Sequence, residues 1–216
     1  MSRKGLFVVF EGIDGSGTST QVHQLEERIE ELDKCQDVLR THEPWKSKEI
    51  TKRLKEDSEA YSGGLEMAEL YIRDRADHTR ILIRPSLETG TIILDSRYKI
   101  STCSFQWVQG VQLHQLLSMH EHRGLLTPDI TFFLDVPREI AQERIKKRRR
   151  RLEKFEKDQE FIDKLINNYR TLTQMAQADS RIFGKVIRIN GYRGIEDVAE
   201  DIYHEFRKVY DNWKSD

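Results

Sequence analysis

Cysteine is almost absent from this chain, which has 216 residues and only Cys35 and Cys103. Two cysteines so far apart provide neither a disulfide framework nor the paired spacing of a zinc site. We predict that both are small buried apolar residues. Long apolar runs are also missing: the first, at 6–10, stops at Glu11. A membrane-spanning helix needs about 20 apolar residues, and a secretory signal needs a longer apolar core. The chain is therefore expected to be cytoplasmic, without a membrane partner.

An excess of one charge is missing as well, since 36 basic and 37 acidic residues leave a formal net charge of −1. Proteins that bind nucleic acid usually carry a basic face, so nucleic acid is not an expected partner. The run KKRRRR at 146–151 is the local exception. Although 34% of the residues are charged, a chain of this length still buries roughly 70% of its unfolded surface. We expect one domain spanning 1–216.

The stretch 6–20, LFVVFEGIDGSGTST, has the layout of a phosphate-binding loop: an apolar strand, a glycine-rich turn and the start of an amphipathic helix. Such a loop points backbone amides into one concavity, and the helix adds its positive end. The spacing of Gly12, Gly17 and Ser19 fits the pattern G-x4-G-K-[ST], but Thr18 stands where lysine is expected. The predicted phosphate-binding residues are Gly12, Ile13, Asp14, Gly15, Ser16, Gly17, Thr18, Ser19 and Thr20, with the Ser19 hydroxyl placed for Mg²⁺.

Strand and helix patterns alternate along the whole chain. Apolar runs at 6–10, 91–95, 130–134 and 186–189, with a short one around Val38 and Leu39, predict five strands. Helical patterns fall at 20–33, 65–89 (bent near Pro85), 98–122, from Pro137, at 161–175 and at 195–209. This alternation predicts an α/β fold with a five-stranded parallel sheet covered by helices on both faces. Ligands bind beyond the carboxyl ends of such strands, where we expect Asp14–Ser19, His42–Glu43, Asp95–Tyr98 and Asp135 to converge.

Six collinear motifs resemble those of the thymidylate kinase family of P-loop nucleoside monophosphate kinases. They are FEGIDGSG at 10–17, THEP at 41–44, LYIRDRADH at 70–78, SRY at 96–98 with Ser101, Phe105 and Gln106, PDIT with LDV between 128 and 136, and EKFE at 153–156. The resemblance covers nearly the whole chain. It implies transfer of the γ-phosphoryl group from ATP to dTMP, which gives dTDP and ADP for dTTP biosynthesis, with Mg²⁺ and in a homodimer.

The resemblance also implies roles for single residues. Asp14 corresponds to the family's loop carboxylate near the acceptor sugar, Tyr71 to the aromatic ring that stacks on thymine, and Arg97 to the arginine on the acceptor phosphate. The acceptor site implied in this way comprises Asp14, Glu43, Tyr71, Arg75, Arg97, Ser101 and Gln106. Ser19 and Asp95 are the predicted metal ligands.

The basic run has three interpretations: a solvated helix end, a nucleic-acid contact, or the lid that closes over ATP. The family places an arginine either in the phosphate loop or in the lid, and here Gly15 occupies the loop position. We therefore favour a lid at about 146–157, in which Arg148 and Arg149 act in catalysis with Asp14 and Arg97.

Four positions depart from the family pattern: Thr18 replaces lysine, His42 replaces arginine, Trp45 replaces a small residue, and Ser96 replaces the aspartate before Arg97. Asp95 lies one residue earlier, and on a strand a one-residue shift turns the carboxylate to the other face unless a bulge intervenes. Three hypotheses stay open: an active thymidylate kinase in which lid residues compensate for Thr18, a non-catalytic nucleotide-binding homologue, and a kinase for another pyrimidine monophosphate.

Overall fold

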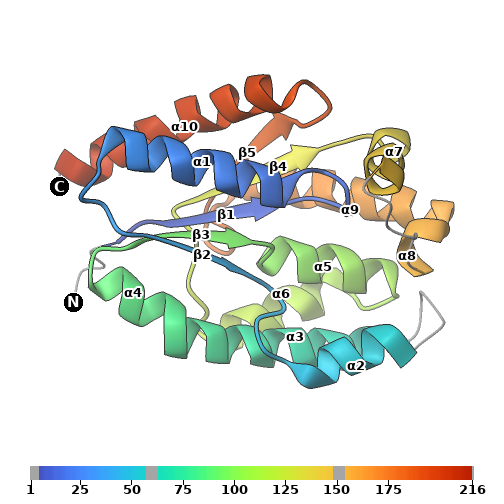
Figure 1. Ribbon diagram of the computed structural model, residues 1–216. Coiled ribbons are helices and arrows are strands. Elements are labelled where there is room, and N and C mark those ends of the chain that lie inside the picture. Colours follow the sequence, from blue (N-terminus) through green and yellow to red (C-terminus); the bar gives the residue numbers. More distant parts are fainter. Residues whose placement is uncertain (1–4, 57–62, 148–153, 216) are drawn as a thin grey trace.

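The computed structural model describes residues 5–56, 63–147 and 154–215, and a five-stranded parallel sheet lies at its centre (Figure 1). The strand order is β2-β3-β1-β4-β5. The strands are β1 (Phe7–Glu11), β2 (Val38–His42), β3 (Ile92–Ser96), β4 (Ile130–Asp135) and β5 (Lys185–Asn190). All four pairings are parallel, so the predicted α/β fold is confirmed.

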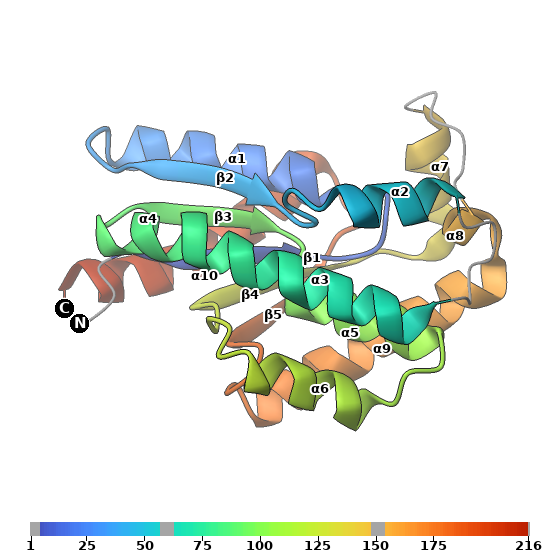
Figure 2. The same ribbon diagram turned by 90° about the horizontal axis from the view of Figure 1, so that it is seen from below.

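Helices cover both faces of this sheet, as the parallel topology requires. The helices are α1 (Thr18–Leu32), α2 (Lys48–Glu56), α3 (Gly64–His78), α4 (Arg84–Glu88), α5 (Lys99–Val108), α6 (Leu113–His122), α7 (Arg138–Lys147), α8 (Lys154–Lys157), α9 (Gln159–Ala178) and α10 (Ile195–Ser215), with a π-helix η1 (Thr79–Ile83). Figure 1 shows α1 and α10 on one side of the sheet, and Figure 2 shows α3, α4, α5 and α9 on the other. Within the described ranges, no helix is long and apolar enough to cross a membrane.

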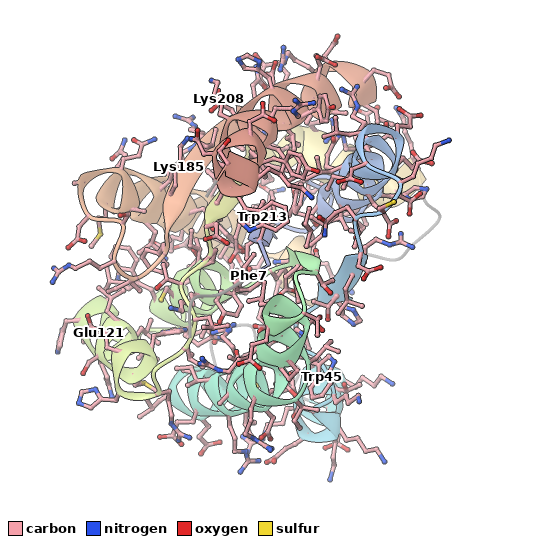
Figure 3. All side chains as sticks on the ribbon, turned by 90° about the vertical axis from the view of Figure 1, so that its left-hand side faces the viewer. Phe7, Trp45, Glu121, Lys185, Lys208 and Trp213 are labelled. Carbon is pink, nitrogen blue, oxygen red and sulfur yellow. The ribbon has the colours of Figure 1, made fainter. Side chains whose placement is uncertain are left out.

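The alternation of side chains along β1 assigns its residues to two cores. Val8 and Phe10 pack with α1 and α10 in one buried cluster, and Phe7 and Val9 join a second cluster on the opposite face. Figure 3 labels Phe7 near the centre of the molecule, between these layers. Because every residue of β1 is buried, its carboxyl end is a rigid base for the loop that follows.

Two sequence predictions need correction here. The helix predicted over 98–122 is two helices, α5 and α6, because the chain turns at Gly110, whose φ of 89° favours glycine. Cys103 is buried as predicted, but Cys35 is exposed, in the turn before β2. The helical path predicted for 65–89 is present as α3, η1 and α4 in direct succession.

Candidate active site

The glycine-rich loop connects the buried end of β1 to the first turn of α1. Gly15 and Gly17 have φ values of 81° and 104°, a region that other residues rarely adopt. A Cβ atom on Gly15 would lie 2.4 Å from the Ala141 carbonyl oxygen, so the loop also packs closely against α7. Gly17 is the N-cap of α1 and provides no side-chain hydrogen bond to the helix. The positive end of α1 therefore has the open geometry that an anionic phosphate group needs.

Thr18 and Ser19 point in different directions at this helix start. Thr18 is only 8% exposed, whereas the Ser19 side chain is exposed, and both line a cavity of about 700 Å³ beside the loop. We call this space the loop cavity; Asp14, Glu43, Ser96 and Arg97 also line it. Ser19 thus lies where its hydroxyl can face the loop cavity, and its contact with Mg²⁺ stays a prediction.

The structure separates Asp95 from Ser19. The ladder between β1 and β3 runs without interruption, with Val9 opposite Asp95 and Phe10 opposite Ser96. No bulge interrupts this ladder, so the side chains of Asp95 and Ser96 point to opposite faces of the sheet. Ser96 lines the loop cavity, whereas Asp95 is fully buried and does not line it. Ser19 and Asp95 therefore do not line the same cavity, and their role as a pair of metal ligands stays a prediction.

Arg97 and Asp14 meet beside the loop. The Arg97 Nη2 atom donates to Asp14 Oδ1 at 2.6 Å, and the guanidinium lies over the Phe105 ring at 5.9 Å. Arg97 has a φ of 73°, the one positive value for a non-glycine residue among the described residues. Strained backbone of this kind costs about 1–3 kcal/mol and occurs mostly at functional sites. The Arg97 amide donates to the Phe10 carbonyl at 2.8 Å, which holds this conformation against β1.

Glu11, which the sequence analysis did not single out, stabilises the backbone around Arg97. Its Oε1 atom accepts hydrogen bonds from the backbone amides of Tyr98 (2.9 Å) and Ser101 (3.1 Å), and its Oε2 accepts from the Ser101 hydroxyl at 2.5 Å. Burial raises the pKa of this carboxyl above its usual value. Glu11 thereby joins the end of β1 to the first turn of α5 and fixes the backbone on both sides of Arg97.

Arg75 is almost fully buried and saturated with protein partners. It donates to Glu43 Oε2 at 2.6 Å, to the Tyr98 carbonyl and the Thr102 hydroxyl at 2.9 Å each, and to His120 Nε2 at 2.8 Å. Burial lowers the pKa of His120 to about 3, so the neutral imidazole can accept this bond. Arg75 is thus part of the wall of the site and is held in place by the Glu43 carboxylate, in the loop directly after β2.

A second, narrower cavity of about 230 Å³ lies on the other side of Arg97, and we call it the inner cavity. It is lined by the predicted acceptor residues Asp14, Glu43, Tyr71, Arg75, Arg97, Ser101 and Gln106, together with Phe105 and others. Burial raises the pKa of Tyr71 to about 12, so its phenol stays neutral beside this space. The Oε1 atom of Gln106 is buried and has no hydrogen-bond partner within the described part of the chain. The loop cavity and the inner cavity share three residues, Asp14, Glu43 and Arg97.

Asp135 and the lid arginines were expected at the edges of the site. Asp135 does not line either cavity, because Arg170 and Arg188 bind its carboxylate at the end of β4. Convergence of Asp135 on the cleft was therefore a wrong prediction. Arg148 and Arg149 lie outside the described residues, which include only 146–147 and 154–157 of the expected lid.

Arg144, on α7, is a residue that sequence reasoning missed. Its Nη1 atom donates to the Ser16 carbonyl at 3.1 Å, so a guanidinium lies directly against the phosphate loop. Its place before the basic run was visible in the sequence, but only the packing of α7 on Gly15 brings it to the loop.

A phosphate loop after the central strand of a parallel sheet, joined through a half-buried arginine, Arg97, to a second small cavity, is the arrangement of a P-loop nucleotide kinase. Residues 10–202 match the model of the thymidylate kinase family. A probable thymidylate kinase of Pyrococcus horikoshii is 33% identical over 205 residues, which cover 92% of this chain and 94% of the relative. A probable thymidylate kinase of Thermococcus onnurineus is 34% identical over 211 residues, with 91% and 95% covered. The thymidylate kinase of Caldicellulosiruptor saccharolyticus is 30% identical over 214 residues, with 97% of each chain covered. This chain therefore belongs to the thymidylate kinase family of phosphotransferases.

Proposed function

We propose that this chain transfers the γ-phosphoryl group of ATP to the 5′-phosphate of dTMP, with ATP in the loop cavity and dTMP in the inner cavity. The observation that carries the proposal is that the two cavities share Asp14, Glu43 and Arg97. A donor and an acceptor placed on either side of one guanidinium would bring two phosphate groups to the same cation. Phosphoryl transfer needs this positioning and charge neutralisation more than covalent chemistry from the protein.

The residues that line the inner cavity offer groups that suit a pyrimidine monophosphate. Tyr71 offers an aromatic face, and the buried Oε1 atom of Gln106 offers an unused acceptor. Thymine carries one ring N–H donor that could satisfy this acceptor, and Arg97 at the junction suits bidentate binding of the phosphate. The Asp14 carboxylate holds Arg97 in place and would also lie near the acceptor sugar.

Mg²⁺ is part of the proposal because the family uses ATP as donor. Within the loop cavity, the hydroxyls of Ser19 and Ser96 and the carboxylate of Asp14 offer the oxygen atoms that this ion prefers, with room for the waters that it retains. These residues fit the ion. When bound, Mg²⁺ would neutralise the charge on the β- and γ-phosphates. We also propose, on the family resemblance, a cytoplasmic homodimer, which sedimentation equilibrium would test by measuring the mass in solution.

A coupled ADP-release assay with ATP, Mg²⁺ and each of dTMP, dUMP, UMP and dCMP tests the reaction. We expect turnover with dTMP well above that with the other acceptors. One methyl group gives only about 1–3 kcal/mol of discrimination, so dUMP is the competitor that matters. The buried position of Thr18 and the presence of Ser96 in the loop cavity favour one alternative, a non-catalytic nucleotide-binding homologue. Nucleotide binding without turnover on any acceptor would support that alternative and contradict the proposal.

Replacing Gln106 with leucine should raise KM for dTMP about 10- to 100-fold and leave KM for ATP unchanged. Loss of a hydrogen bond in a buried site leaves the base N–H unpaired, which costs about 1–3 kcal/mol. Steady-state kinetics with each substrate varied in turn measures the effect. Gln115→Leu, at an exposed position on α6, is the matched control. An unchanged KM for dTMP in Gln106→Leu would show that the base does not bind at this amide.

A further inference from the structure

The carboxyl group of Asp95 lies in the protein interior without a side-chain hydrogen-bond partner among the described residues. Its residue is fully buried, and within 5–56, 63–147 and 154–215 neither carboxylate oxygen has a hydrogen-bond partner. The proposed phosphoryl transfer does not use it, because Asp95 lines neither the loop cavity nor the inner cavity. Burying a carboxylate without compensation costs several kcal/mol, so a proton or a cation must accompany it.

Two metal-ligating side chains lie beside this carboxylate. One ligand atom from each of Glu43, His78 and Asp95 falls within 4.8 Å of the other two, and all three residues are buried. The His78 Nδ1 atom is 3.4 Å from Glu43 Oε1. Two ligand atoms bound about 2.1 Å from one tetrahedral cation would be separated by about 3.4 Å. The geometry of the cluster is therefore close to that of a metal site, and a small movement of Asp95 would complete it.

The other atoms of the cluster are already oriented for such a role. His78 Nε2 is 2.8 Å from the Thr41 hydroxyl, and if this nitrogen donates the bond, Nδ1 presents its lone pair toward Glu43. A hydrogen bond from the other ring nitrogen to an oxygen atom is the usual support of a metal-binding histidine. The opposite oxygen of Glu43, Oε2, accepts from Arg75 at 2.6 Å. The hydrogen bonds of Arg75 go to Glu43, Tyr98, Thr102 and His120, so its positive charge acts on Asp95 only from a distance.

Trp45 closes the outer side of the cluster. Its ring stacks on the His78 imidazole at 5.1 Å with an interplanar angle of 15°, and its amide donates to Asp74 on α3 at 2.5 Å. Figure 3 labels Trp45 at the side of the molecule where α2 and α3 lie. Trp45 is one of the departures from the family pattern, and it stacks on the histidine of the same cluster that contains Asp95. The π-helix η1 begins directly after His78, and such segments frequently accompany functional sites.

We propose that Glu43, His78 and Asp95 bind a divalent transition-metal cation, Zn²⁺ in the first instance, in a buried structural site beside the inner cavity. One imidazole and two carboxylates form a mixed nitrogen and oxygen set that suits Zn²⁺. Mg²⁺ is a poor candidate because it prefers oxygen ligands and retains several waters. Since Glu43 also holds Arg75 and lines both cavities, the cation would fix the wall of the acceptor site.

The test uses the full chain without nucleotide or Mg²⁺, so its outcome does not depend on kinase activity. The protein is stripped with a chelator, exposed to Zn²⁺, and passed through a desalting column before elemental analysis. We expect about one equivalent of retained Zn²⁺ per chain and a rise in Tm of about 5 °C over the stripped protein. Co²⁺ in place of Zn²⁺ should give the visible absorption of a low-symmetry nitrogen and oxygen site, which requires no variant.

Asp95→Asn and His78→Gln should each reduce Zn²⁺ retention at least about tenfold and abolish the Zn²⁺-dependent rise in Tm, since each removes one of three ligands. His23→Gln is the matched control, because His23 is an exposed histidine with Glu26 and Glu27 close by and reports adventitious surface binding. The competing occupant is a proton, since burial raises the pKa of Asp95 above its usual range. Equal Zn²⁺ retention by the wild-type protein and Asp95→Asn, or a wild-type Tm that Zn²⁺ does not change, would assign the proton and overturn the proposal.

Discussion

Replacing Arg97 with alanine should lower kcat for phosphoryl transfer to dTMP about 100- to 1,000-fold while ATP still binds. Removal of one preorganised group that stabilises developing charge costs about 3–4 kcal/mol of transition-state stabilisation. Arg97 is such a group: it lines both cavities, and the Phe10 carbonyl and the Asp14 carboxylate hold it in a strained conformation before any substrate arrives. Steady-state kinetics gives kcat, and calorimetry gives the affinity for ATP.

The control for this change is Arg80→Ala. Arg80 lies in η1, is 71% exposed and is bound to Asp77. We expect Arg80→Ala to leave kcat and the affinity for ATP unchanged. Arg97→Lys should recover only part of the loss, because an ammonium group cannot contact a phosphate and Asp14 in the planar geometry of guanidinium. If Arg97→Ala turned over dTMP at the wild-type rate, the acceptor phosphate would have to bind elsewhere. The proposal that ATP binds in the loop cavity and dTMP in the inner cavity would then be wrong.

The fold and the phosphate loop could be predicted from the sequence because their signals are local. A buried strand followed by glycines at fixed spacing determines the course of 6–20 whatever the rest of the chain does. Gly15 and Gly17 take the positive φ values that this loop requires. The alternation of strands and helices likewise leaves few topologies open. The predicted acceptor residues also came together around the inner cavity, although their order in the sequence did not contain that geometry.

The sequence did not predict the surroundings of side chains whose direction depends on residues far away in the chain. Asp95 and Ser96 are neighbours in sequence, and only the uninterrupted pairing of β3 with β1 decides which of them faces the loop cavity. Asp135 was placed correctly at the end of β4, but Arg170 and Arg188 bind it from two other elements. Arg144 reaches the loop because α7 packs against Gly15, a contact across more than a hundred residues. Local patterns cannot encode such long-range pairings.

The loop cavity has an unusual set of charged residues for a site that is proposed to bind ATP. The position of the loop lysine is Thr18, and the position of the strand-end aspartate is Ser96. A polyphosphate there would meet the positive end of α1 and the guanidinium of Arg97. Arg144 adds a cation on the other side of the loop, where its guanidinium binds the Ser16 carbonyl. The lost lysine charge can thus be supplied from Arg144 on α7, two residues before the expected lid begins.

This arrangement predicts that Arg144→Ala lowers kcat/KM for ATP about 100-fold in the wild-type chain, but less than about tenfold when Thr18 is also replaced by lysine. The Arg144 guanidinium and a lysine introduced at position 18 would neutralise the same phosphates. Removing Arg144 therefore lowers activity most when that lysine is absent. Thr18→Lys alone should then raise kcat/KM for ATP only modestly, by less than about tenfold, instead of by the full contribution of about 3 kcal/mol expected for a newly introduced stabilising charge.

A double-mutant cycle with the wild-type protein, the two single variants and the double variant measures this coupling directly. Lys208→Ala is the control, since Lys208 is a half-exposed cation on α10 that is bound to Glu205, away from the loop cavity. Strictly additive effects of Arg144→Ala and Thr18→Lys would contradict compensation by Arg144. A Thr18→Lys variant that gained activity from an inactive wild-type chain would mean that nothing in this protein replaces the lysine. The non-catalytic hypothesis would then account best for Thr18 and Ser96 in the loop cavity.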